Sequence, residues 1–192
     1  MSSAADKRAA YGPQLVLRPA RAAEAVPLAA LVNSAYRGDS SRAGWTTEAD
    51  LLGGQRTDPL ALSEFIKRGA LRDDRAMLMH EVAGEPLACV QLERHDGHAY
   101  LGMLTIQPAM QGTGLGRSLL AAAEAFIRDH WRLPRVVMTV IEQRVELIAW
   151  YERRGYRRTG ETAPFPYGDP RFGEPKRADL RFVVLDKEWS AT

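Results

Sequence analysis

The chain has 192 residues, 45% of them hydrophobic, so it is long enough to bury a core and short enough for one domain. Its 26 basic and 24 acidic side chains leave a net charge of only +2, which argues against nucleic acid as a partner. The single cysteine, Cys89, excludes an intrachain disulfide framework, and no apolar run reaches the ~18 residues of a membrane span. We therefore expect a soluble, cytoplasmic protein that uses neither nucleic acid nor a membrane as its partner.

The first part of the chain predicts a tail, one strand and three helices. Residues 1–13 lack an apolar signal core and are expected to be a flexible tail ahead of a single domain over residues 14–192. A weakly alternating segment predicts the first strand over 14–18. Apolar residues at helical spacing, and a capping-box pattern at Thr47 and Asp50, predict helices that lie over 22–36, 47–52 and 59–68.

The second part of the chain alternates between apolar and polar residues and is rich in strands. Short glycine-containing turns predict an antiparallel meander, followed by a glycine-rich loop and two further helices. Strands are expected over 76–82, 87–94, 98–106, 135–140, 157–162 and 178–185, and helices over 115–130 and around Tyr151. This order predicts an α/β (α+β) fold, with a mixed, mostly antiparallel central sheet of about seven strands and helices on both faces.

The glycine-rich loop has the sequence QGTGLG at residues 111–116 and lies between an apolar strand and a helix. The first N–H groups of a helix have no partner inside it, and the helix dipole is positive at that end, so the loop suits a phosphate. Arg117 adds a cation. The spacing G-x-G-x-G and the missing lysine exclude a dinucleotide fingerprint and a P-loop. The alternative is an ordinary turn between strand and helix.

Two motifs resemble the GNAT superfamily, the acyl-CoA-dependent N-acetyltransferases. The pattern Q-x-x-G-x-G, directly after LTIQP at 104–108, resembles the family's motif A, and residues 147–156 resemble its A-x-x-Y-x-x-x-G-F/Y element. Leu147 departs from the small residue usual there, and Arg144 falls where the family often has a CoA-contacting asparagine. The resemblance implies a GNAT-like fold whose central strands splay to leave a slot for pantetheine, with acetyl-CoA as cosubstrate and no metal.

The same resemblance assigns residues to roles. Cofactor binding is expected at Leu104, Thr105, Ile106, Gln111, Gly112, Thr113, Gly114, Leu115, Gly116, Arg117 and Arg144. Tyr151 matches the tyrosine that can protonate the departing CoA thiolate, and a backbone N–H of the 104–106 strand is the expected oxyanion donor. The alternative for Tyr151 is a core aromatic on an amphipathic helix.

A base would help, because an amine with a pKa of ~10.4 is mostly protonated near neutral pH. Glu93, at the end of the strand before the motif strand, is the first choice for the general base. The alternatives that stay open are His98, Tyr100, Glu142 and a water chain with no dedicated base.

Acceptor binding is expected in two connections that would roof the slot. Tyr36, Arg37 and Trp45 lie in the first, and Tyr167 lies in the last loop with several other aromatic residues. The same residues could instead pack the loops onto the sheet or form a contact in a homodimer. The arginines at 153, 154, 157 and 158 fit a solvated face or a contact with the 3′-phosphate of CoA.

The predicted function is transfer of an acetyl group from acetyl-CoA to a primary amine of a small molecule or peptide, by direct attack in a ternary complex. The alternative is a non-catalytic acyl-CoA-binding or regulatory module on the same fold.

Overall fold

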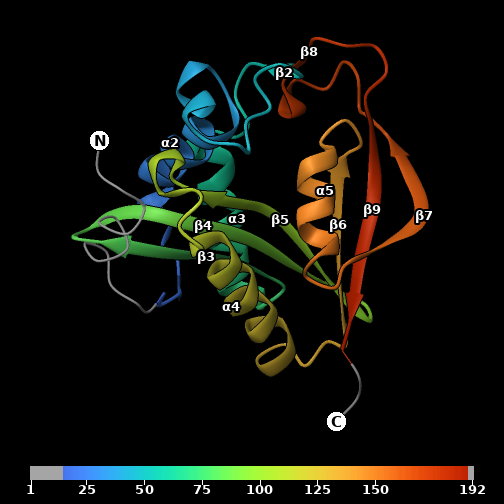
Figure 1. Ribbon diagram of the computed structural model, residues 1–192. Helices are drawn as coiled ribbons and strands as arrows, with labels where there is room; N and C mark the ends of the chain where they lie inside the picture. The colour runs from blue at the N-terminus through green and yellow to red at the C-terminus, as the bar shows by residue number, and fades with distance from the viewer. Residues whose placement is uncertain (1–14, 190–192) are drawn as a thin grey trace.

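The computed structural model describes residues 15–189 and contains a central sheet of seven strands in the order β1-β3-β4-β5-β6-β9-β7 (Figure 1). The strands are β1 (Arg18–Pro19), β3 (Arg75–Val82), β4 (Glu85–His95), β5 (His98–Ile106), β6 (Arg135–Ile141), β7 (Arg157–Pro164) and β9 (Arg181–Glu188). Within the described residues, β5 and β6 are parallel and every other neighbouring pair is antiparallel. The predicted mixed, mostly antiparallel sheet is confirmed, while the predicted tail over 1–13 lies outside the described residues.

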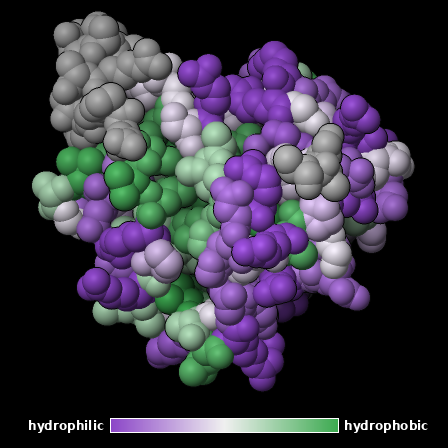
Figure 2. Space-filling view, turned by 90° about the horizontal axis from the view of Figure 1, so that it is seen from below, coloured by the Kyte–Doolittle hydropathy of each residue, from purple (hydrophilic) through white to green (hydrophobic). Residues whose placement is uncertain are grey.

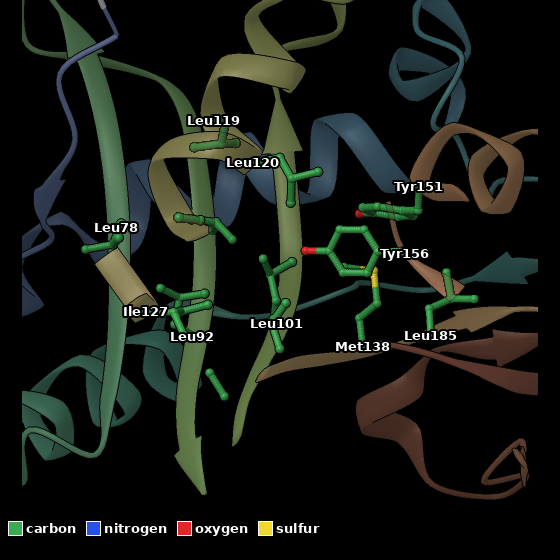
Figure 3. Close-up of a cluster of buried hydrophobic side chains, with 14 of the residues drawn as sticks. Leu78, Leu92, Leu101, Leu119, Leu120, Ile127, Met138, Tyr151, Tyr156 and Leu185 are labelled. Atoms are coloured by element: carbon green, nitrogen blue, oxygen red, sulfur yellow. The ribbon is translucent and has the colours of Figure 1, made fainter. Parts of the chain in front are cut away.

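Helices cover both faces of the sheet, as predicted. One face of β3 and β4 packs against α2 (Ala25–Tyr36) and α3 (Pro59–Arg72), with Cys89 fully buried between them. The opposite face packs against α4 (Leu115–Asp129), whose Leu119, Leu120 and Ile127 meet leucines from three strands in Figure 3. The remaining helix, α5 (Val145–Glu152), lies beside β6 and β9 and contributes to the same core.

Two predicted elements differ from the structure. Residues 47–52 form no helix: the Thr47 hydroxyl accepts from the amide of Ala49 at 3.1 Å, and the chain makes a single turn. The turn ends because β2 (Leu52–Gly53) pairs antiparallel with β8 (Glu174–Pro175), a partner that local sequence cannot indicate. The first strand, predicted over 14–18, is the two-residue β1 and includes Pro19.

A bulge in β5 opens the centre of the sheet. Between the pairs Cys89↔Thr105 and Gln91↔Gly102, one residue of β4 faces two residues of β5, and Met103 adopts a positive φ of 46°. Such a bulge bends its strand. As a result β5 and β6 pair only through Ala99 and Tyr100 among the described residues and then diverge. The predicted splay between the central strands is therefore present.

Two connections lie over this opening. The first joins α2 to α3 and contains the short helix η2 (Asp39–Ala43), and the second follows β7 and contains the short helix η4 (Pro170–Phe172). The pairing of β2 with β8 joins them, as the upper part of Figure 1 shows. Lys176 adds two contacts, because its amide donates to the Leu51 carbonyl at 2.9 Å and its Nζ donates to the Ala49 carbonyl at 2.6 Å.

Hydrophobic and hydrophilic residues are unevenly distributed on the face of the molecule that is seen from below in Figure 2. Figure 2 shows hydrophobic groups gathered on one side of this face, next to a larger hydrophilic area. None of the helices within residues 15–189 is long and apolar enough to cross a membrane.

Candidate active site

A cavity of about 280 Å³ lies where β5 and β6 diverge, and we call it the glycine-loop cavity. Its floor is the glycine-rich loop and the start of α4, and its walls come from β5, α5 and the first connection. The lining residues used below are Tyr36, Trp45, Thr46, Leu104, Ile106, Gly112, Gly114, Gly116, Arg117, Arg144, Trp150, Tyr151 and Arg154.

The loop has a backbone that favours glycine and leaves its amides free. Gly112 has a φ of 79°, and Gly114, the residue that precedes α4, has a φ of 95°; both angles are costly for other residues. The amides of residues 112–116 donate no hydrogen bond to the rest of the described chain. Together with the positive end of the α4 dipole, these amides form a site for an anion.

Two arginines add positive charge at the edge of this cavity. Arg117 is exposed and makes no ion pair within the described residues. The Arg154 guanidinium lies 3.5 Å from the centre of the Trp150 ring and donates to the Trp150 carbonyl at 2.6 Å. Burial, then the neighbouring charges of Arg153 and Arg117, lower the pKa of Arg154. An anion between Arg117 and Arg154 would relieve this repulsion.

The side chain of Gln111 holds the first connection against the loop. Its Oε1 accepts from the amide of Trp45 at 2.9 Å, while its Nε2 donates to the Thr46 hydroxyl at 2.8 Å and to the Ile106 carbonyl at 3.2 Å. Gly44 permits this approach, because a Cβ there would lie 2.5 Å from Oε1. Gln111 thus positions Trp45 and Thr46, both of which line the cavity.

Several residues predicted to bind the cofactor turn their side chains elsewhere. The Thr105 hydroxyl donates to the Met103 carbonyl and the Thr113 hydroxyl donates to the Met110 carbonyl, each at 2.8 Å. Leu115 packs against the main core. None of these three residues lines the glycine-loop cavity, whereas Leu104 and Ile106 do.

A second cavity, of about 120 Å³, lies beneath the two connections, and we call it the arginine cavity. Its charged and polar lining consists of Arg37, Glu48, Arg56, Tyr100, Thr139 and Arg144, and its apolar lining includes Leu52, Ile141, Phe165, Phe172 and Phe182. The two cavities share Tyr36, Leu104, Arg144, Leu147 and Tyr151. They therefore meet beside the bulged part of β5.

Tyr151 lies at this junction with its side chain 5% exposed. Its ring is 5.0 Å from the Trp150 ring and 5.4 Å from the Tyr156 ring, and Figure 3 shows the two tyrosines in the space between β5 and β6. Burial, and secondarily the nearby Tyr36, raise the pKa of Tyr151, so its hydroxyl is protonated at neutral pH. This hydroxyl has no hydrogen-bond partner among residues 15–189 and is free to donate to a ligand.

A buried ion-pair network forms one side of the arginine cavity. Glu48 contacts Arg37 through one carboxylate oxygen and Arg144 through the other, the latter at 2.6 Å. Arg144 also donates to the Thr46 carbonyl at 2.5 Å. Burial alone would raise the pKa of Glu48, but Arg144, Arg37 and Arg56 outweigh it and hold that pKa below its usual range. Glu48 is therefore ionised and is poorly suited to accept a proton.

Tyr36 connects this network to β5. Its hydroxyl donates to the Leu104 carbonyl at 2.9 Å, and the guanidinium carbons of Arg144 and Arg56 lie 5.7 Å and 5.9 Å from its ring centre. Asn33 fixes the backbone beside Arg56, because its Oδ1 accepts from the Arg56 amide at 2.7 Å. Burial raises the pKa of Tyr36, which keeps its hydroxyl protonated.

The structure does not bring every candidate residue together. Trp45 lines the glycine-loop cavity instead of the arginine cavity and packs 6.2 Å from Trp150. Tyr167 lines neither cavity; its hydroxyl donates to the Arg177 carbonyl and accepts from the Leu180 amide, which fixes the last loop.

Among the candidate bases, the structure places Tyr100 at the arginine cavity, with its hydroxyl 2.8 Å from that of Thr139. Glu93 lines neither cavity, and its carboxylate accepts from Gln91 at 2.8 Å. Glu142 is paired with Arg181, which lowers the pKa of its carboxyl. His98 lies at the far end of β5 and stacks on His95.

Several residues of the cavities were not singled out as site residues from the sequence. Among them are Glu48, Arg56, Trp150 and Arg154. Arg154 belongs to the arginine cluster for which the sequence is consistent with a solvated face or a phosphate contact, and Trp150 lies next to the motif tyrosine. Neither Glu48 nor Arg56 has a local signal, because each faces its cavity through contacts with other elements.

Solved structures with the same fold include two named acetyltransferases. The PaiA N-acetyltransferase from Thermoplasma acidophilum, in complex with coenzyme A, aligns with a TM-score of 0.65 and 14% identity, over 92% of this chain and 100% of that one. The ribosomal-protein-alanine N-acetyltransferase from Brucella melitensis aligns with a TM-score of 0.67 and 18% identity, over 91% of this chain and 100% of that one. At these identities the likeness establishes the fold.

Curated relatives match a shorter region. A mycothiol acetyltransferase from Salinispora tropica is 36% identical over 87 residues, which is 43% of this chain and 28% of that protein. The enzyme of the same name from Salinispora arenicola is 36% identical over 90 residues, or 47% of this chain and 26% of that protein. The match thus spans little more than a quarter of these relatives.

The match to a protein family is longer than the matches to these relatives, and it covers residues that line both cavities. It runs over residues 42–156, more than half of the chain, and includes Glu48, the glycine-rich loop and Tyr151. The chain therefore belongs to the acetyltransferase (GNAT) family.

Proposed function

We propose that this protein transfers an acetyl group from acetyl-CoA to a primary amine of a small molecule or peptide, by direct attack within a ternary complex. The observation that carries the proposal is the junction of the two cavities at Leu104 and Tyr151. One cavity has free amides and cations suited to a phosphate-bearing cofactor, and the other has room for an acceptor. Family membership supports the same activity.

The glycine-loop cavity fits CoA in its chemistry. The free amides of 112–116, the α4 dipole and the two arginines at 117 and 154 would bind the negatively charged pyrophosphate. Beyond the bulge, β5 has backbone groups that β6 does not pair, and these suit the amides of pantetheine. Trp45 and Trp150 would cover this arm and exclude water.

Acetyl-CoA, when bound, supplies a thioester carbonyl as the electrophile and a thiolate as the leaving group. Tyr151 is placed to donate a hydrogen bond or a proton to that thiolate, because its hydroxyl is neutral and has no competing partner within residues 15–189. A backbone N–H of the bulged strand would stabilise the oxyanion. Tyr100 is the ionisable candidate base in the arginine cavity, and Glu93 could act only through intervening groups or water.

The relatives agree with an amine acceptor without fixing which one. They include mycothiol, spermidine and ribosomal-protein-alanine acetyltransferases. We also propose that the protein works in the cytoplasm, in keeping with its one fully buried cysteine. A homodimer contact through the last loop stays a prediction.

The rival function is a non-catalytic acyl-CoA-binding or regulatory module. It would use the glycine-loop cavity in the same way, and it is favoured because residues 15–189 offer no clear carboxylate base in the arginine cavity. Under this alternative Tyr151 would be a core aromatic whose hydroxyl serves no chemical step.

Two measurements separate these functions. Calorimetric titration with acetyl-CoA tests the cofactor site, and release of CoA thiol across a panel of amines tests transfer. Binding together with amine-dependent thiol release is expected. Binding without thiol release from any amine would support the regulatory module instead, and the absence of binding would refute both functions.

A further inference from the structure

We propose that the acceptor amine carries an anionic group, most simply a carboxylate, and that Arg56 binds this group in the arginine cavity. The inference rests on the proposed function and names the class of acceptor: small amino-acid-like amines, and not polyamines.

The charges that line the arginine cavity do not balance. Its ionised residues are Arg37, Arg56, Arg144 and Glu48, and its other titratable residues are tyrosines. Both oxygens of Glu48 are already occupied, one by Arg37 and one by Arg144. Among the residues that the structure describes, a cationic acceptor would therefore find no free carboxylate in this cavity, whereas an anionic group would find an excess of positive charge.

Arg56 is the cation with free donors. Its side chain is half-buried and makes no ion pair or hydrogen bond within residues 15–189, although its guanidinium lies over the Tyr36 ring. Its backbone is fixed on α2 through Asn33. In addition, Nε of Arg37 is buried without a hydrogen-bond partner, and Arg37 itself is 5% exposed. A buried donor without a partner is uncommon, and together with the free donors of Arg56 it indicates that a ligand atom completes the site.

The position of Arg56 fits a small acceptor. Its guanidinium contacts one side of the Tyr36 ring, and the hydroxyl of the same ring donates to the Leu104 carbonyl at the junction of the cavities. An acceptor with its carboxylate at Arg56 and its amine near Leu104 needs to span one aromatic ring. The phenylalanines at 165, 172 and 182 provide an apolar wall for its side chain.

The positive charge of the arginine cavity also favours deprotonation of the acceptor amine. Nearby cations disfavour the ammonium form of an amine, so a bound acceptor releases its proton to solvent water more readily than the free amine does. This supplies part of what a carboxylate base would do and is consistent with a cavity whose only lining carboxylate, among the described residues, is Glu48. The carboxylate of the acceptor would offset the repulsion on binding.

The test compares three acceptors that differ only at the proposed anion: leucine, leucinamide and isopentylamine, with spermidine as a polycation. Thiol release is measured for the unmodified protein, Arg56→Gln, Arg56→Lys and the control Arg68→Gln, which alters an exposed arginine on α3. We expect Arg56→Gln to lower kcat/KM for leucine by ~10- to 100-fold, through KM, because a charge-assisted hydrogen bond is lost. Leucinamide should be nearly unaffected, Arg56→Lys should recover part of the loss, and Arg68→Gln should match the unmodified protein.

The inference is overturned if spermidine or isopentylamine is preferred to leucine, or if Arg56→Gln lowers the rates for leucine and leucinamide equally. If no amine releases thiol, the proposed function fails on its own. The charge inference is then judged by calorimetry with N-acetylleucine and N-acetylleucinamide in the presence of CoA, where only the carboxylate should bind and only when Arg56 is intact.

Discussion

Replacing Glu48 with glutamine should strongly destabilise the protein. The side chains of Glu48, Arg37 and Arg144 are 8%, 4% and 9% exposed, and Glu48 alone neutralises both arginines. Removing its charge leaves two buried guanidinium groups without a counter-ion, and breaking a buried pair in this way costs about 3 to 5 kcal/mol of the free energy of unfolding. For a chain of this size the melting temperature should fall by roughly 6 to 20 °C.

The assay is urea and thermal unfolding followed by circular dichroism, with Glu64→Gln as the control. Glu64 is exposed on α3, so its substitution should change the free energy of unfolding by less than ~0.5 kcal/mol. A loss below ~1 kcal/mol in Glu48→Gln would refute the reasoning, because the arginines would then be solvated or paired elsewhere.

The stability that Glu48 contributes should depend on pH, in a direction set by the pKa of its carboxyl group. The pKa of Glu48 is lowered in the folded state, so its contribution to stability is complete above the unfolded value and is lost as the pH falls through the folded value. The stability difference between the unmodified protein and Glu48→Gln should therefore be largest near neutral pH and shrink in acid.

Three further predictions concern the glycine-loop cavity. Tyr151→Phe should lower kcat by ~10²-fold or more and retain the affinity for acetyl-CoA, which steady-state rates and calorimetry would check. Because burial raises the pKa of Tyr151, the alkaline limb of the pH–rate profile should be unchanged in this variant. Gly114→Val should abolish acetyl-CoA binding, whereas Gly84→Val, with a similar φ in a turn outside the cavity, should only destabilise. Gln111→Leu should raise KM for acetyl-CoA by ~10-fold, because the three hydrogen bonds that Gln111 makes with the Trp45 amide, the Thr46 amide and the Thr46 hydroxyl are lost.

The sequence predicts the parts of the site that depend on local backbone. The glycine-rich loop is visible because positive φ angles and free helix N–H groups require particular residues next to one another. The position of Tyr151 at the cavities is predicted for a similar reason, since most of its motif lies on the short helix α5. The strands of the sheet are predicted from the alternation of apolar and polar residues, and β5 has the predicted bounds.

The arginine cavity could not be predicted in this way. Arg144 meets Glu48 across 96 residues of sequence, and Arg56 reaches Tyr36 only because Asn33 holds its backbone. The same reason explains the wrong helix at 47–52, whose capping signal was real but whose continuation was overridden by pairing with β8. Side-chain roles likewise depend on direction: the hydroxyls of Thr105 and Thr113 bond nearby backbone carbonyls, and neither residue lines the glycine-loop cavity.

The bulge at Met103 has a consequence for how the sheet avoids association with other chains. Beyond Tyr100, the side of β5 that faces β6 is an unpaired strand edge, and exposed edges are templates for pairing with foreign strands. Here the edge lies in the middle of the molecule, between α4, α5 and the two connections, and not at the border of the sheet. The fold thus keeps a ladder position inside the protein that suits a narrow ligand with amide groups.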